Sequence, residues 1–210
     1  FSDLYKTLEQ PEGPAVALIN DTYTEYYCPE VGVAAVKVLN SLGYHVLLPE
    51  WRCCGRAALS KGFLEEAKAK ALSLIKPLQP LALQGIPLIG LEPSCYYSIQ
   101  DEYLDLIPEE VTPILDKLHY FDSFLYSHLP LSFQSFKPAQ IALHGHCHQK
   151  ALEGMQTTLG EVLAHEAGMS TERNLHDMQE VQNYIEALGY GIKRLQEFPL
   201  SLRLIREVHG

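Results

Sequence analysis

The fold is decided by residues 15–43, which read AVALINDTYTEYYCPEVGVAAVKVLNSLG. The stretch opens with AVALI, five apolar residues whose number and β-branched content are typical of a buried strand. A polar loop follows, and Pro29 then begins a pattern of apolar residues at helical spacing that ends at Gly43. A proline in the first turn and a glycine after the last turn are usual helix boundaries, so this stretch predicts one β–α unit.

The same order of strand, loop and helix recurs along the chain. Short apolar runs predict further strands at residues 45–48, 87–91 and 140–143, and helical patterns are expected at residues 63–75, 96–106 and 156–167. The apolar stretch 78–91 is interrupted by proline and glycine, so it is predicted to be a loop followed by the third strand. Alternating strands and helices predict an α/β fold with a parallel sheet and helices on its faces.

A change of pattern in the second half of the chain suggests two unequal halves. Residues 111–137 look helical and then irregular, and we expect them to connect residues 1–137 to a second half at residues 138–210. After Gly168 no strand pattern is evident, and helices are expected at residues 178–188 and 192–206. The halves are predicted to be pseudo-repeats, the second one degenerate with a helical tail.

Composition excludes several classes of protein. With 210 residues, 47% of them hydrophobic, the chain can bury a large core without disulfide bonds. A net charge of −10 argues against a nucleic-acid partner, because phosphate binding needs basic residues. No run approaches the ~18 apolar residues of a membrane span, which is compatible with peripheral membrane attachment. No signal-peptide pattern opens the chain, so we expect a cytoplasmic protein; its first residue is Phe1, which suggests a cut or processed N-terminus.

All five cysteines are predicted to lie at corresponding positions, just after a strand. Each falls a few residues after an expected strand, and they are Cys28, Cys53, Cys54, Cys95 and Cys147. Because the carboxyl ends of parallel strands meet at one edge of a sheet, several thiols are predicted to converge there. An odd number of widely spaced cysteines in a chain without secretory features favours metal or redox chemistry over a disulfide framework.

The pair Cys53 and Cys54 is followed by Gly55, which would allow the backbone to approach a ligand closely. Two neighbouring thiolates could bind one metal cluster, and a disulfide between them is the competing interpretation. Each cysteine taken alone is more often a small core residue than a metal ligand.

Three histidines surround the last cysteine in the segment HGHCHQ, residues 144–149. Imidazoles near Cys147 would lower the pKa of its thiol or donate hydrogen bonds to a cluster, and His146 and His148 are the nearest. The alternatives are solvated histidines in a loop, or zinc, whose usual protein ligands are cysteine and histidine.

Three motifs resemble those of a known family. The segments CCGR (53–56), LEPSC (91–95) and LHGHCHQKAL (143–152) resemble the cysteine-rich CCG domain of heterodisulfide reductase B subunits and of glycolate and D-lactate oxidising enzymes. The resemblance is greatest to the C-terminal iron–sulfur region of FAD-linked oxidases of 2-hydroxy acids, and it covers roughly residues 15–168. A second CCG motif is missing, since no cysteine follows Cys147.

The resemblance implies an iron–sulfur cluster of the 4Fe–4S type, with Cys53, Cys54, Cys95 and Cys147 as ligands. Secondary candidates are Cys28, which the resemblance leaves unmatched, and Gly55, His146 and His148. Electrons would pass from a reduced flavin to a further acceptor. The FAD would lie on another domain or subunit, because no GxGxxG fingerprint opens a helix here. The chain is thus expected to be the electron-transfer part of an oxidoreductase. The alternatives are a cluster-free structural or degenerate subunit, and a zinc site or a dithiol redox switch at Cys53 and Cys54.

Overall fold

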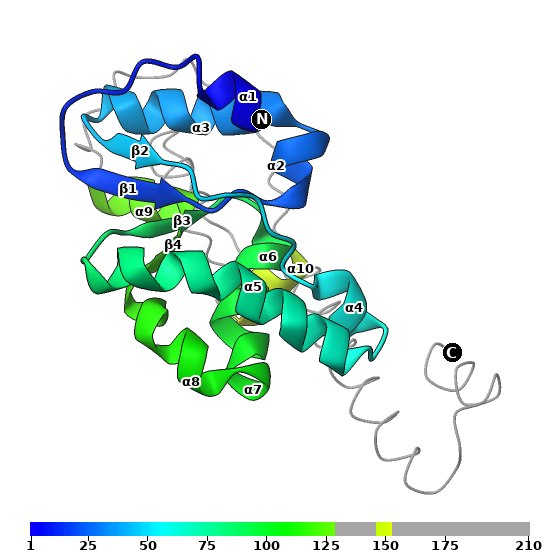
Figure 1. Cartoon of the computed structure of the whole chain (residues 1–210). Helices are drawn as coiled ribbons and strands as arrows, with labels where there is room; N and C mark the ends of the chain where they lie inside the picture. Colours follow the sequence, from blue (N-terminus) through cyan, green and yellow to red (C-terminus); the bar gives the residue numbers. More distant parts are fainter. Residues whose placement is uncertain (129–145, 153–210) are drawn as a thin grey trace, which may run out of the picture.

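Four short parallel strands form the centre of the molecule (Figure 1). The computed structural model describes residues 1–128 and 146–152. Its strands are β1 (Ala15–Leu18), β2 (His45–Leu47), β3 (Leu88–Gly90) and β4 (Leu118–Tyr120), in the spatial order β2-β1-β3-β4. The register places Val16 opposite Val46 and Ile89 opposite His119. The predicted α/β fold with a parallel sheet is confirmed.

Helices occupy the segments between the strands. They are α1 (Ser2–Tyr5), α2 (Thr22–Tyr26), α3 (Pro29–Ser41), α4 (Arg56–Ser60), α5 (Leu64–Leu83), α6 (Pro93–Tyr97), the π-helix η1 (Ser98–Glu102), α7 (Tyr103–Leu106), α8 (Pro108–Val111), the 3₁₀-helix η2 (Thr112–Lys117), α9 (Phe121–His128) and α10 (Cys147–Leu152). The segments α6, η1 and α7 follow one another without a break, as the single helix expected at residues 96–106 would.

The sheet separates two hydrophobic clusters. Alternate residues of a strand point to opposite faces, and Val16 and Leu18 join the cluster that contains α3, whereas Ala17 packs into the cluster that contains α5. Phe124 of α9 belongs to the α3 side. Figure 1 shows α3 above the sheet and α5 below it. The crossovers to β2 and from β2 therefore run on opposite faces.

The loop expected after β1 contains a short helix that its polar composition concealed. The carboxylate of Asp21 accepts hydrogen bonds from the backbone N–H groups of Tyr23 and Thr24, at 2.8 and 2.9 Å, and so caps α2. Helix α3 begins at Pro29 as predicted, and Gly43 follows it with a φ of 86°.

Helix α5 is longer than the sequence predicts. It continues through Pro77 and Pro80 to Leu83, so the expectation of a loop at the start of residues 78–91 is wrong. A proline inside a helix removes one backbone hydrogen bond and disfavours helix there. The apolar stripe nevertheless continues with Leu78 and Ala82, both buried in the α5 cluster, and this burial outweighs the local preference.

The strand β4 is absent from the sequence expectations, which placed an irregular connector after the helical part of residues 111–137. Three residues are too few to give an alternating pattern, although Leu118 is buried and pairs with Leu88. The strand expected at residues 140–143 and the helices expected after residue 152 lie outside the described residues. The division at residue 137 stays a prediction; α10, from the predicted second half, packs against α6.

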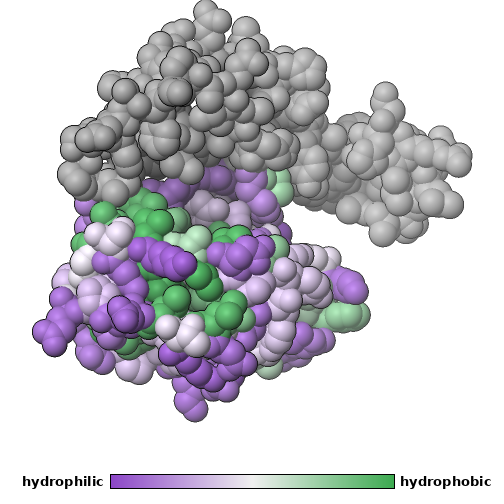
Figure 2. Space-filling view, turned by 90° about the horizontal axis from the view of Figure 1, so that it is seen from above, coloured by the Kyte–Doolittle hydropathy of each residue, from purple (hydrophilic) through white to green (hydrophobic). Residues whose placement is uncertain are grey.

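An apolar groove lies between α1 and α3 on the face shown in Figure 2. Its volume is about 500 Å³, and Leu4, Leu8 and Val33 are among its lining residues. The residues that line it include none of the cysteines. In the described part of the chain, every helix is too short or too polar to pass through a lipid bilayer.

Candidate functional site

The strand order reverses between β1 and β3, because the chain moves from β1 to β2 on one side and then crosses back to β3 on the other. In open α/β sheets, ligands bind in the crevice outside the carboxyl ends of the strands at such a reversal. The loop after β1 brings Asp21 to this point, and after β3 the chain brings Glu92, which caps α6, and Cys95, which lies in α6. The loop after β2 returns to the same place with Cys54.

Cys54 and Cys95 are in direct contact. The thiol of Cys95 donates a hydrogen bond to Sγ of Cys54 over 2.9 Å, and both side chains are buried. This hydrogen bond, together with one from the backbone N–H of Arg56, lowers the pKa of Cys54. The same contact and burial raise the pKa of Cys95, with smaller contributions from Asp21 and Glu92. The pair therefore holds one proton firmly and releases the other more easily.

Cys53 lies beside this pair but is not bonded to it. All five cysteines are free thiols, so the competing interpretation of a disulfide between Cys53 and Cys54 is not realised. The backbone N–H of Gly55 lies 3.4 Å from Sγ of Cys53.

Gly55 serves packing in a way that the sequence did not indicate. Its φ is 77°, and a Cβ atom at this position would lie 3.1 Å from both the backbone oxygen of Ala67 and Cβ of Lys70. Glycine thus lets the cysteine loop lie directly on α5. The close approach is made to a helix, where the sequence suggested an approach to a ligand.

Tyr103 also fixes the loop that carries Cys54. The hydroxyl of Tyr103 donates a 2.6 Å hydrogen bond to the backbone oxygen of Cys54, and its side chain is buried. Burial is the main cause that raises the pKa of Tyr103, and the neighbouring thiols Cys54 and Cys95 add to it. The phenol therefore keeps its proton and remains a donor, which orients the backbone that carries Cys54.

Cys147 is exposed and begins α10, with histidines on both sides of it. Nε2 of His146 lies 3.4 Å from the hydroxyl of Ser94, the residue before Cys95. Nε2 of His148 lies 2.7 Å from a guanidinium nitrogen of Arg56, two residues after Cys54. The two imidazoles therefore bring α10 beside both segments that carry the contacting thiols, the loop of Cys54 and helix α6 of Cys95.

Arg56, Glu102 and Tyr103 were missed in the sequence as parts of the site. Arg56 forms an ion pair with Glu102, which ends η1. Arg56 directly follows the CCG motif, so its position was a usable signal. Glu102 and Tyr103 lie about two helical turns after Cys95 on the expected helix, a spacing that places residues on the same side.

The expected ligands are brought together only in part. Cys28 is partly buried at the start of α3, where its backbone N–H donates to the oxygen of Tyr23. Within residues 1–128 and 146–152, no three cysteine, histidine or acidic side chains are grouped closely enough to hold a metal ion. The donor chemistry fits an iron–sulfur cluster or zinc, because thiols are ligands of both. The described geometry supplies two of these thiols in contact, with the other two on neighbouring segments.

Comparison with known proteins gives relatives among dehydrogenases. The chain is 26% identical over 143 residues to the C subunit of the anaerobic glycerol-3-phosphate dehydrogenase of Escherichia coli K12, a match that covers 65% of this chain and 36% of the relative. It is 32% identical over 93 residues to D-2-hydroxyglutarate dehydrogenase of Haemophilus influenzae, which covers 44% of this chain and 9% of the relative. The matched part of the chain thus spans about a third or less of the length of these two relatives.

A third relative covers more of the chain. Lactate utilization protein A of an Exiguobacterium strain is 28% identical over 186 residues, covering 85% of this chain and 72% of the relative. Residues 1–168 are too few to supply that coverage, so the likeness extends past Gly168, the limit that the motifs suggested.

A family model matches a different part of the chain. The Fic/DOC family N-terminal model matches residues 150–193, and it is not the family that the cysteine motifs resemble. No solved structure matches the chain. Taken together, the relatives confirm a likeness to components of oxidoreductases.

Proposed function

We propose that this chain is the iron–sulfur electron-transfer module of a dehydrogenase, and that Cys53, Cys54, Cys95 and Cys147 hold a cluster of the 4Fe–4S type. The observation that carries the proposal is the 2.9 Å contact between Cys54, in the loop after β2, and Cys95, in the short helix α6 after β3, at the reversal of the sheet. The helix that carries Cys147 packs against α6, and His148 joins it to Arg56 at the start of α4. Cysteine thiolates from separate segments around one point are the ligand type that such clusters use.

The proposed substrate of the whole enzyme is a small 2-hydroxy acid. Two of the relatives are named for D-2-hydroxyglutarate and for lactate, which are both 2-hydroxy acids. Glycerol 3-phosphate, named in the third, shares with them a secondary alcohol. A flavin on another domain or subunit would oxidise this alcohol, and the present chain would carry the electrons onward.

The protein's own groups prepare the site for metal. Both Cys54 and Cys95 must lose their protons when they bind a metal. The lowered pKa of Cys54 makes the first loss easier, whereas the raised pKa of Cys95 means that the metal itself must displace the second proton. Burial of the pair keeps water away from it. When bound, a cluster would supply a one-electron carrier whose potential depends on burial and on nearby hydrogen-bond donors.

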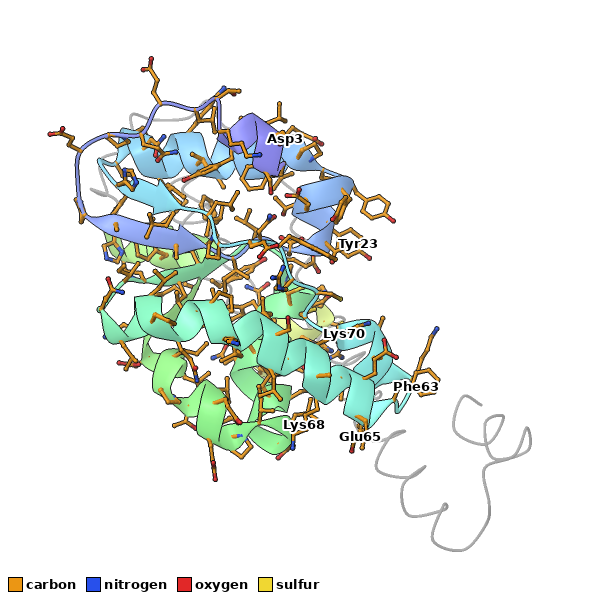
Figure 3. The ribbon with its side chains drawn as sticks, in the orientation of Figure 1. Asp3, Tyr23, Phe63, Glu65, Lys68 and Lys70 are labelled. Atoms are coloured by element: carbon orange, nitrogen blue, oxygen red, sulfur yellow. The ribbon has the colours of Figure 1, made fainter. Side chains whose placement is uncertain are left out.

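A positive charge lies near these thiols. Lys70 projects from α5 (Figure 3), and its ammonium donates to Glu66 over 2.6 Å. Its pKa is raised mainly by Glu66, with smaller contributions from Cys53 and Cys54. Its charge would partly offset the negative charge that builds up when the cysteines become thiolates.

The test is the iron and acid-labile sulfide content of protein purified without oxygen. The proposal expects a brown protein with broad absorbance near ~400 nm that bleaches on reduction, as iron–sulfur proteins show. Cys54→Ala and Cys95→Ala should each lose the iron. A colourless anaerobic preparation that also fails to take up iron and sulfide on reconstitution would reject the proposal, and one equivalent of zinc in its place would favour the zinc alternative.

The contact between Cys54 and Cys95 also favours a second candidate, a dithiol redox pair. Two thiols would lose two protons and two electrons to a small disulfide oxidant such as oxidised glutathione, and would form a disulfide while the oxidant becomes two thiols. The pair would be Cys54 with Cys95, in place of the Cys53–Cys54 switch that the sequence suggested. A disulfide between Cys54 and Cys95, identified by mass spectrometry in a protein that takes up no iron, would favour this candidate.

A further inference from the structure

Arg56 connects three segments that are far apart in the sequence. It is the first residue of α4, its guanidinium pairs with the carboxylate of Glu102, and another of its nitrogens lies 2.7 Å from Nε2 of His148. The sequence separation between Arg56 and His148 is 92 residues. The guanidinium is therefore the point at which the CCG loop, the helix after Cys95 and α10 are joined.

The chemistry of these groups decides which of them donates each hydrogen bond and which accepts it. A guanidinium only donates hydrogen bonds, so Nε2 of His148 must be unprotonated and accept from Arg56. The carboxylate of Glu102 balances the charge of Arg56 on its other side. Both side chains of this ion pair are partly covered, at 28% and 26% exposed, and a charge-assisted hydrogen bond in such a place is stronger than one between neutral groups.

Glu102 reaches Arg56 from an unusual turn. The segment Ser98–Glu102 is a π-helix inserted between α6 and α7. The wider turn changes the direction in which later side chains leave the helix, and such turns are frequent at functional sites. Glu102 at its end meets Arg56, and Tyr103 directly after it holds the backbone of Cys54.

A second contact on the other side of Cys147 is consistent with the same seating of α10. Nδ1 of His146 lies 3.3 Å from the backbone N–H of His148 and accepts from it. Nε2 of His146 faces the hydroxyl of Ser94 at 3.4 Å. This contact is long and weaker than the one from the guanidinium, so Arg56 is the stronger attachment.

We propose that Arg56, held in place by Glu102, is a positioning residue that seats α10 and thereby places Cys147 beside the loop of Cys54 and the helix of Cys95. The assignment of Cys147 as a ligand rests on the proposed function, whereas the seating of α10 does not. Arg56 itself supplies no ligand atom. Its effect on the site is exerted through His148 and the helix that follows Cys147.

The seating is measured by amide hydrogen exchange of the peptide spanning residues 146–152, in the full chain made iron-free with a chelator under reducing conditions. Loss of a charge-assisted hydrogen bond in Arg56→Ala should speed this exchange roughly tenfold. Arg56→Lys keeps the charge but lacks the planar fork, so its exchange should lie between Arg56→Ala and the wild type. The matched control is Arg52→Ala, which removes an arginine four residues before Arg56 whose guanidinium pairs with Glu50 at 2.6 Å and donates to the backbone oxygen of Trp51; its exchange should equal that of the wild type.

The outcome that overturns the proposal is wild-type exchange at residues 146–152 in both Arg56→Ala and Glu102→Gln. Circular dichroism checks that each variant folds. If Arg56→Ala does not fold, Glu102→Gln, which keeps the side-chain size, decides with Arg56→Lys. Equally fast exchange of residues 146–152 in Arg52→Ala would also overturn the proposal, because the loss of any positive charge in this region would then explain the effect.

A second readout separates this inference from the proposed function. After anaerobic reconstitution with iron and sulfide, Arg56→Ala should show a changed electron paramagnetic resonance spectrum of the reduced cluster, partly restored in Arg56→Lys. If the wild type takes up no iron, the proposed function fails, and the exchange experiment still decides the seating of α10. If the wild type takes up iron and Arg56→Ala has both wild-type exchange and a wild-type spectrum, the positioning role fails alone.

Discussion

The Sγ atoms of Cys54 and Cys95 lie 2.9 Å apart although 41 residues separate them in the sequence. Cys54 lies in the loop that follows β2 and Cys95 in helix α6, which follows β3, and between those strands lies β1. The contact is therefore a product of the crossover and of the sheet reversal.

Removal of either contacting thiol should abolish metal binding with little effect on the fold. Cys54→Ala and Cys95→Ala are expected to bring the iron content of anaerobic protein close to zero. The free energy of unfolding of the iron-free protein should fall by less than about 2 kcal/mol, as small changes in a core usually cost. Iron analysis and urea unfolding measure the two effects, and a variant with a full iron content would remove its cysteine from the proposed ligand set.

Cys28 is expected to be a cysteine that does not bind the metal. Its described contact is made by its backbone at the start of α3, so Cys28→Ala should keep the wild-type iron content. The measurement is the same iron analysis on protein prepared in parallel. A loss of iron in this variant would add Cys28 to the ligands.

Tyr103→Phe should destabilise the protein and loosen the loop that carries Cys54. The substitution leaves the buried backbone oxygen of Cys54 without the donor seen at 2.6 Å, which costs about 1–3 kcal/mol. Tyr27→Phe is the control, because Tyr27 is 71% exposed and its change should stay within about 0.5 kcal/mol. Equal unfolding midpoints in urea for the two variants would contradict the role of the hydrogen bond.

Gly55 and Gly62 form a matched pair for testing how the cysteine loop lies on α5. Both have a φ of 77°, but an added Cβ meets neighbouring atoms at 3.1 Å only at Gly55 and has open space at Gly62. Gly62→Ala should therefore cost about 1 kcal/mol from backbone strain alone. Gly55→Ala should cost about 1–3 kcal/mol more, the range typical of overpacking. Thermal or urea unfolding gives the difference, and equal costs would mean that the loop can move away from α5.

The stability of the protein should fall in acid partly through Glu25. Burial raises the pKa of this carboxyl, but hydrogen bonds from Asn20 and Ser2 outweigh it, so the pKa lies below its ordinary value of 4.5. A lowered pKa contributes stability above 4.5, and this contribution is lost as the pH falls through the lowered value. Urea unfolding of the wild type and Glu25→Gln between neutral and acidic pH should show their difference shrinking as the pH falls; a constant difference would contradict the contribution of the charge.

The sequence predicted most of the sheet because the signals were local. The runs that became β1, β2 and β3 are short, apolar and bounded by turns, and the meeting of thiols followed from the rule that parallel strands end at one edge. The prediction held for Cys54 and Cys95. The edge strand β4 and the extension of α5 through Pro77 were not predictable in this way, since tertiary burial decided them against weak or contrary local preferences.

Arg56 could have been noticed because it follows the CCG motif, but the contacts that support the site could not be predicted from local sequence patterns. The ion pair between Arg56 and Glu102 depends on how α4 and η1 are turned toward each other, and a π-helical turn shifts that direction relative to a regular helix. No residue type in residues 98–102 indicates a π-helical turn. The position of Tyr103 beneath Cys54 depends on the same turn.

A ligand or bond that bridges the two contacting sulfur atoms would also affect the stability of the fold. A ligand or bond that joins Cys54 and Cys95 closes a loop of about 40 residues that contains all of α4 and α5. Chain-entropy arguments assign roughly 4 kcal/mol to the closure of a loop of this length, through the conformations that it removes from the unfolded chain. Occupancy of the pair would thus fasten the whole β2-to-β3 crossover, and the loaded and empty forms should melt at clearly different temperatures.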